Sequence, residues 1–168
     1  MFFMGMPGSG KSYWGSTVAT AYSLPFIDLD ARIQERVGMQ IADYFEKYGE
    51  HEFRLREQET LLDVIHNKEK NHIVACGGGT PVFFNNLTEM KKAGCTIYLD
   101  ANIEYLLQRL ANSPTRRPLL EGKELNKALL ELYHKRNPFF SQADYIFDIE
   151  NISVSKFENI LPSCIGRH

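Results

Sequence analysis

Residues 5–12 read GMPGSGKS and fit the pattern G-x-x-x-x-G-K-[ST] at every fixed position. The apolar run at residues 1–4 predicts a strand before this loop, and residues 11–22 predict a helix after it. Glycines let backbone N–H groups turn inward around phosphate oxygens, and a helix N-terminus adds free N–H groups and the positive end of its dipole. The order strand, glycine loop, helix therefore favours a phosphate-binding loop over an ordinary glycine-rich turn.

The side chains of this loop predict a nucleoside triphosphate and a metal ion as ligands. Lys11 is placed to reach the β- and γ-phosphates of ATP, and the hydroxyl of Ser12 is placed to hold Mg²⁺. The backbone of Gly8, Ser9 and Gly10 supplies the N–H groups around the phosphates. We therefore expect ATP as a partner and Mg²⁺ as the cofactor.

Length and composition predict one soluble globular domain over residues 1–168. Hydrophobic residues make up 43% and charged residues 24% of the chain, which is typical of a protein with one substantial core. The formal net charge of −2 gives no basic field for nucleic acid, and the apolar run at residues 1–4 is too short for a signal peptide or a membrane span. We expect a monomer with neither nucleic acid nor a membrane as partner.

The three cysteines, Cys76, Cys95 and Cys164, are odd in number and far apart. Their spacing predicts neither a metal site nor a disulfide framework. This favours a reducing compartment, so we expect the protein in the cytoplasm.

Short apolar runs alternate with longer helical patterns along the chain. Strands are expected at 1–4, 25–28, 72–76, 95–99 and 145–148, with helices near 11–22, 30–36, 40–48, 51–68, 82–93, 102–111, 124–136 and 153–161. Strands that are apolar throughout and separated by helices predict a parallel sheet covered on both faces. The expected fold is α/β, a three-layer α/β/α sandwich with a central five-stranded parallel sheet, and its ligand lies at the carboxyl ends of the strands.

Two carboxylates and an arginine are candidates for work beside the phosphate loop. Asp28 and Asp30 end the second expected strand, where one can approach Mg²⁺ and the other can accept a proton from a substrate hydroxyl. The alternative for Asp30 is a plain helix N-cap. Arg54 and Glu57 share a helix face, so Arg54 can clamp a substrate carboxylate while Glu57 holds it, unless they form only a surface ion pair.

Three later segments add to this set. Gly77, Gly78 and Gly79 follow the third expected strand and remove side chains where a ligand can approach the backbone, although a flexible turn is the alternative. Residues 112–123 hold two prolines, a glycine and the pair Arg116–Arg117, and are interpreted as an active-site lid or a solvated connector. Arg136 ends a later helix. Arginines on a closing lid can neutralise charge in phosphoryl transfer.

With these motifs in this order, the chain resembles the bacterial shikimate kinases, within the nucleoside-monophosphate-kinase-like group of phosphate-loop proteins. The likeness covers roughly residues 1–148, and only the combination of motifs is specific to the family. The motifs are residues 5–12, Asp28-Leu-Asp30, Phe53-Arg54 with Glu57, Gly77-Gly78-Gly79, Arg117-Pro118-Leu119-Leu120, and Arg136 with Pro138. The resemblance implies transfer of the ATP γ-phosphate to the 3-hydroxyl of shikimate, the fifth step towards chorismate and the aromatic amino acids.

The resemblance also implies a role for each matching position. Lys11, Asp30 and Arg117 are the expected catalytic residues. ATP is expected on Gly8, Ser9, Gly10, Lys11, Ser12, Arg109 and Arg117, shikimate on Asp30, Arg54, Gly77, Gly78, Gly79 and Arg136, and the metal on Ser12 and Asp28. Within the single domain, the substrate-binding helical region is expected at about 30–60 and the lid at about 112–123. The chain departs from the family at Tyr13-Trp14, where smaller residues are usual, and at Phe140, where a tyrosine is expected.

Three other functions fit parts of the sequence. Gluconate kinases share the fold and the phosphate loop, but gluconate has no ring, and the set of Asp30, Arg54, the glycine triplet and Arg136 fits shikimate better. A GTPase switch commonly carries Asn-Lys-x-Asp, and residues 67–70 and 126–129 both lack the aspartate. A non-catalytic nucleotide-binding protein would not need the complete set of Lys11, Ser12, Asp30 and Arg117.

Overall fold

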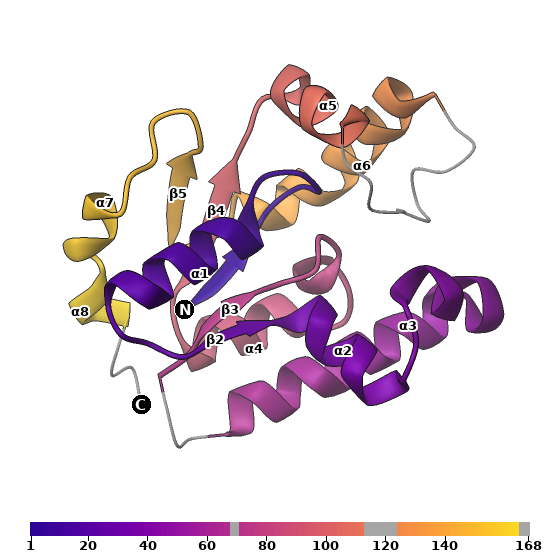
Figure 1. Cartoon of the computed structure of the whole chain (residues 1–168), viewed down its shortest axis with the longest axis horizontal. Coiled ribbons are helices and arrows are strands. Elements are labelled where there is room, and N and C mark those ends of the chain that lie inside the picture. The colour runs from indigo at the N-terminus through magenta and orange to yellow at the C-terminus, as the bar shows by residue number, and fades with distance from the viewer. Residues whose placement is uncertain (68–70, 113–123, 165–168) are drawn as a thin grey trace.

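The fold is built on one sheet of five parallel strands (Figure 1). This computed structural model describes residues 1–67, 71–112 and 124–164. The strands lie side by side in the order β2 (Phe26–Asp28), β3 (Ile73–Ala75), β1 (Phe2–Met4), β4 (Thr96–Asp100) and β5 (Tyr145–Asp148). The five strands expected from the apolar runs are confirmed.

Strand β1 occupies the centre of the sheet and is buried on both faces. Successive side chains of a strand point to opposite faces, so Phe2 and Phe3 face different layers. Phe3 lies 5.6 Å from Phe157 between ring centroids, while a Cβ on Gly94 would lie 3.6 Å from the ring of Phe2. A strand covered from both sides needs apolar side chains throughout, which is why β1 has no polar residue.

Helices cover both faces of this sheet and connect the parallel strands. In chain order they are α1 (Lys11–Ala21), α2 (Leu29–Val37), α3 (Ile41–His66), the 3₁₀ turn η1 (Thr80–Val82), α4 (Asn86–Ala93), α5 (Ile103–Ala111), α6 (Leu125–Phe140), α7 (Ser155–Glu158) and α8 (Leu161–Cys164). The predicted class, an α/β fold with a parallel sheet between helices, is confirmed. None of the helices in the described part of the chain is long and apolar enough to cross a membrane.

Four helices differ from those expected. The helix expected at 82–93 begins at Asn86, as α4, after the separate turn η1. Helix α3 spans both helices expected at 40–48 and 51–68, with a kink at Gly49, whose φ of 82° is left-handed. Helix α6 continues past 136 through Pro138 and ends at Phe140. A proline in the last turn removes one backbone hydrogen bond, and the buried ring of Phe140 stacks on Tyr98 at 5.2 Å and holds the turn. The single helix expected at 153–161 is two short helices, α7 and α8.

The expectation of three unpaired cysteines is wrong for two of them. Cys95 and Cys164 form a disulfide, with Cα atoms 5.1 Å apart, which joins α8 to the start of β4. Cys76 is the free cysteine and is buried. The pairing was not visible in the sequence because 69 positions separate the two residues.

Candidate functional site

The phosphate loop connects β1 to α1 and is folded around its own lysine. The ammonium group of Lys11 donates hydrogen bonds to the carbonyl oxygens of Gly5 (3.1 Å) and Met6 (3.0 Å). Gly10 is the N-cap of α1 with φ at 86°, a left-handed conformation that glycine adopts without strain. No side chain of the described residues caps α1, so its first N–H groups are available to an anion.

Two side-chain oxygens of a kind that can bind a metal ion lie beside this loop. The hydroxyl of Ser12 donates to Asp28 Oδ2 at 2.5 Å. Asp28 also accepts from the N–H of Ala31 and is the N-cap of α2, whereas Asp30 lies in the first turn. The interpretation of Asp30 as the N-cap is therefore wrong. One hydroxyl and one carboxylate fit the way Mg²⁺ is held when substrate phosphates complete its shell.

The glycine triplet, residues 77–79, follows β3 and lies against charged side chains. A Cβ on Gly77 would lie 2.8 Å from Asp30 Oδ1 and 2.5 Å from Glu57 Oε1. Real Cβ atoms do not come this close to other atoms. The carboxylates of Asp30 and Glu57 therefore reach the backbone of the triplet only because it has no side chain there.

The next two glycines are approached by guanidinium groups. A Cβ on Gly78 would lie 2.8 Å from Arg136 Nη1, and one on Gly79 would lie 2.6 Å from Arg54 Cζ. These arginines come from two different helices, α6 and α3. With Asp30 from α2, three elements distant in the sequence thus bring their charged side chains to one short stretch of backbone. A flexible turn would not require this packing.

Arg54 is fixed within the protein by two carboxylates and an aromatic ring. Its Nη1 donates to Glu57 Oε2 at 2.8 Å, and its Nε and Nη2 donate to Glu50 Oε1 at 3.2 and 2.9 Å. The guanidinium also lies 4.4 Å from the centre of the Phe83 ring. Because Arg54 and Glu57 are 4% and 0% exposed, the alternative of a surface ion pair is wrong.

Arg136 is buried without comparable support. Only 5% of the residue is exposed, and no carboxylate in the described part of the chain forms an ion pair with it. Burial, and then the nearby charge of Arg54, lower the pKa of Arg136 to about 10. The charges of Glu57 and Glu50 offset part of this shift, but neither carboxylate pairs with Arg136 directly. A buried guanidinium without an ion pair favours an anionic ligand that can pair with it.

Two predicted positions remain, Arg109 and Arg117, and the structure describes only Arg109. Arg109 lies beside the phosphate loop, since a Cβ on Gly10 would lie 3.3 Å from its Nη1. Its guanidinium donates to the hydroxyl of Tyr105 at 3.1 Å. Arg117 and positions 113–123 of the expected lid lie outside the described residues.

Sequence reasoning missed three residues of this site. Glu50 pairs with Arg54 from four positions earlier, a spacing that was visible in the sequence. Phe83 stacks on the same guanidinium, and Thr80 donates to Glu57 at 2.6 Å. The contacts of Phe83 and Thr80 join α3 to the segment after β3, so no local sequence pattern predicts them.

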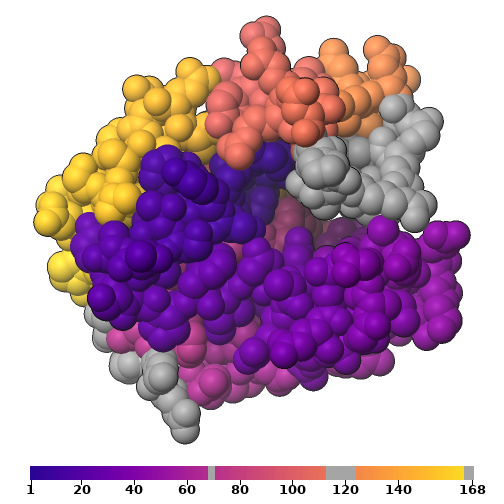
Figure 2. All heavy atoms as spheres, in the orientation of Figure 1, coloured from indigo at the N-terminus to yellow at the C-terminus, as the bar shows by residue number. Residues whose placement is uncertain are grey.

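The molecule is hollowed on the face that carries the phosphate loop. Figure 2 shows the hollow between the indigo N-terminal segment, the purple stretch of α2 and α3, and α5. One pocket of about 280 Å³ adjoins Arg136, and its lining residues are Glu50, Val82, Phe83, Ala128, Glu131, Leu132, Lys135 and Arg136. It therefore includes Glu50 and Phe83, two of the three partners of Arg54.

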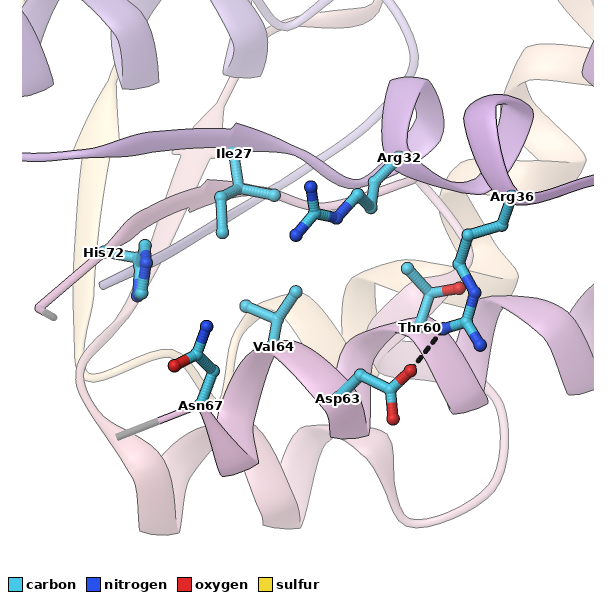
Figure 3. A pocket seen from close by; sticks show the side chains of 8 residues that line it. All are labelled: Ile27, Arg32, Arg36, Thr60, Asp63, Val64, Asn67 and His72. Atoms are coloured by element: carbon cyan, nitrogen blue, oxygen red, sulfur yellow. Dashed lines mark hydrogen bonds and ion pairs between the residues drawn. The ribbon is translucent and has the colours of Figure 1, made fainter. Parts of the chain in front are cut away.

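A second pocket, of about 270 Å³, lies under the edge strand β2 (Figure 3). It includes His72, just before β3 begins, and its two arginines, Arg32 and Arg36, come from α2. Arg36 is already paired with Asp63 across the pocket. No residue of the phosphate loop or the glycine triplet lines this pocket, so we do not assign the reaction to it.

Comparison with known proteins gives one consistent family. The family model described as "Shikimate kinase" matches residues 7–164. The shikimate kinase of Azobacteroides pseudotrichonymphae is 37% identical over 166 residues, covering 96% of this chain and 97% of that protein. The shikimate kinase of Bacteroides thetaiotaomicron is 35% identical over 155 residues, covering 90% and 87%.

Solved structures agree with the sequence comparison. The crystal structure of the Bacteroides thetaiotaomicron shikimate kinase has a TM-score of 0.87 at 34% identity, covering 96% of this chain and 97% of that one. The shikimate kinase of Acinetobacter baumannii in complex with shikimate also has a TM-score of 0.87, at 29% identity, with 96% and 92% covered. A gluconokinase from Sinorhizobium meliloti, at 16% identity and a TM-score of 0.56, shares the fold alone.

Proposed function

The chain belongs to the shikimate kinase family, and from this premise we propose that it transfers the γ-phosphate of ATP to the 3-hydroxyl of shikimate, giving shikimate 3-phosphate and ADP. One observation carries the proposal for this site. Asp30, Arg54 and Arg136 converge on the glycine triplet that follows β3, the strand beside the one that leads into the phosphate loop. Shikimate offers ring hydroxyls and one carboxylate, so it needs a carboxylate and guanidinium groups in this arrangement.

On the nucleotide side, the loop binds the phosphates of ATP. The N–H groups of Gly8, Ser9 and Gly10 surround the phosphate oxygens, and Lys11 leaves its carbonyl partners for the β- and γ-phosphates. Phosphoryl transfer depends mainly on positioning and on stabilising charge at the transferred group. Arg109, beside the loop, contacts the nucleotide.

On the nucleotide side, Ser12 would hold Mg²⁺ directly and Asp28 would hold it directly or through water. When bound there, the ion would supply positive charge next to the phosphates. Ser12 and Asp28 fit this task because their oxygens already lie within 2.5 Å of each other. In the described part of the chain no group of three metal-binding side chains exists, so phosphates and water must complete the shell.

On the acceptor side, Asp30 binds the hydroxyls and accepts the proton of the 3-hydroxyl as the new O–P bond forms. Arg54 and Arg136 grip the carboxylate of shikimate, and the backbone of Gly77, Gly78 and Gly79 lines the ring. The substrate-binding helical region is then about 30–60. Arg117, on the lid at about 112–123, adds positive charge at the phosphates and stays a prediction from the sequence.

We further propose that the single domain, residues 1–168, acts as a monomer in the cytoplasm, with neither nucleic acid nor a membrane as partner. The net charge of −2 gives no basic field for nucleic acid. In that compartment cellular thiols keep most cysteines reduced. We therefore expect Cys95 and Cys164 to be thiols in the cell and to pair on oxidation.

The test is release of ADP in the presence of Mg²⁺ and ATP, with shikimate, with gluconate and with no acceptor. We expect strong stimulation by shikimate alone, because only shikimate presents both a ring and a carboxylate to Asp30, Arg54 and Arg136. Stimulation by gluconate, or equal rates without an acceptor, would refute the proposed acceptor. Lys11→Ala, which removes the phosphate contact, should nearly abolish turnover and serves as the control for contaminating kinases.

A further inference from the structure

Thr80, the first residue of η1, connects the glycine triplet to the arginine on α3. Its hydroxyl donates to Glu57 Oε1 at 2.6 Å, while the other carboxylate oxygen, Oε2, accepts from Arg54 Nη1 at 2.8 Å. All three side chains are buried, with Thr80 and Glu57 at 0% exposure and Arg54 at 4%. Each oxygen of Glu57 thus has its own donor, and only one of these donors belongs to the proposed substrate site.

Thr80 is itself held at both ends of its backbone. Its N–H donates to the carbonyl of Gly77 at 3.1 Å, and its carbonyl accepts from the side chain of Asn86 at 2.9 Å. Asn86 is 1% exposed and begins α4. Thr80 is therefore a fixed point, and its hydroxyl sets where the Glu57 carboxylate lies relative to the glycine backbone.

The position of Glu57 decides which way Arg54 faces. A guanidinium has five N–H groups, of which Glu57 takes one on Nη1 and Glu50 takes the one on Nε and one on Nη2. One N–H on each terminal nitrogen is left by these two carboxylates. One N–H on Nη1 and one on Nη2 thus remain to donate to a substrate carboxylate.

We propose that Thr80 is a positioning residue for the acceptor: its hydroxyl fixes Glu57, and Glu57 turns the two remaining N–H groups of Arg54 toward the substrate carboxylate. The role rests on the proposed shikimate kinase activity. It predicts that loss of the hydroxyl weakens acceptor binding and leaves the nucleotide side unchanged. A purely structural threonine would instead lower thermal stability and affect both substrates together.

The experiment compares Thr80→Val, which keeps the shape of the side chain and removes the hydroxyl, with Thr80→Ser, which keeps the hydroxyl. Thr60→Val is the matched control, because Thr60 is also buried in the protein and donates only to the backbone carbonyl of Arg56. For each variant, ADP release is titrated with shikimate and with ATP, and thermal unfolding is followed by circular dichroism. If Thr80→Val does not fold, Thr80→Ala replaces it.

We expect Thr80→Val to raise KM for shikimate about tenfold, with KM for ATP and kcat within about twofold of the wild type. Thr80→Ser and Thr60→Val should both stay within about twofold for every constant. An unchanged KM for shikimate in folded Thr80→Val, or an equal rise in the KM values for shikimate and ATP, would overturn the role of Thr80. Neither result would contradict the proposed shikimate kinase activity. A wild-type protein that shikimate does not stimulate would overturn the proposed function and this role with it.

Discussion

Replacing Gly79 by alanine tests whether the position of Arg54 matters for the acceptor. The added Cβ would lie 2.6 Å from Arg54 Cζ and 2.8 Å from Nη2, where ordinary contact begins at 3.4 Å. The backbone of Gly79 has φ at −100° and ψ at −16°, which alanine adopts without strain. The only effect of the substitution is therefore a collision with the guanidinium.

The size of the effect follows from what holds Arg54. Because Nη1 would lie closer still, the guanidinium must move by about 1 Å, and it is buried between Glu57, Glu50 and Phe83, which leave little room. A misplacement of about 1 Å at a reacting or positioning group costs on the order of 10²-fold in rate. Overpacking of this kind costs about 2 kcal/mol of folding free energy, or a melting temperature lower by about 6 °C.

We expect kcat/KM for shikimate to fall about 100-fold, with KM for ATP within about twofold of the wild type. The assay is ADP release, titrated with each substrate in turn, together with thermal unfolding. Gly94→Ala is the control, because its Cβ would lie 3.6 Å from the ring of Phe2 and its φ of 169° is extended. A Gly79→Ala protein with normal stability and a kcat/KM for shikimate within twofold of the wild type would refute the placement of Arg54.

Three further predictions concern buried groups. Arg136→Met removes a buried charge that has no ion pair in the described chain, so the ligand-free protein should be as stable as the wild type or more stable by about 1 kcal/mol. Shikimate should no longer raise the melting temperature of this variant. A clear loss of ligand-free stability would contradict the prediction. Burial raises the pKa of the Cys76 thiol, so iodoacetamide at pH 8 should modify it only after the protein is unfolded in guanidinium. Mass spectrometry detects the modification. Labelling of the folded protein within minutes would contradict the buried position of Cys76. The Cys95–Cys164 disulfide closes a loop of 69 positions, so its reduction should lower the free energy of unfolding by about 4 kcal/mol. Guanidinium titrations with and without reductant measure this difference. An effect below about 1 kcal/mol would show that the bond is not formed in solution.

The sheet was predictable because each strand is a short apolar run with a clear boundary. Residues 1–4 are followed by Gly5, and residues 72–76 are followed by the glycine triplet, so the apolar composition and the glycines mark the same strand ends. The phosphate loop was predictable because its chemistry requires fixed residue types at fixed spacings. The pairing of Arg54 with Glu57 followed from helix geometry alone and is confirmed at 2.8 Å.

The remaining features depend on contacts between distant segments. Thr80 reaches Glu57 across 23 positions, and Cys95 meets Cys164 across 69, so neither contact leaves a local pattern. Which aspartate caps α2 is decided by where β2 stops, a boundary that a sequence pattern gives only to within a few residues. Helix α6 passes through Pro138 because Phe140 packs on Tyr98, a tertiary contact that outweighs the usual stop signal.

The two arginines beside the glycine triplet differ in a way that bears on specificity. Arg54 already has two carboxylate partners, Glu50 and Glu57, so its positive charge is compensated within the protein and its direction is fixed. Arg136 has no carboxylate partner among the described residues, and its pKa is lowered by burial and by Arg54. A buried cation without an ion-pair partner is costly, and an anionic substrate would offset that cost on binding. We therefore propose that Arg136 selects a carboxylate through its charge and that Arg54 orients it through its fixed geometry.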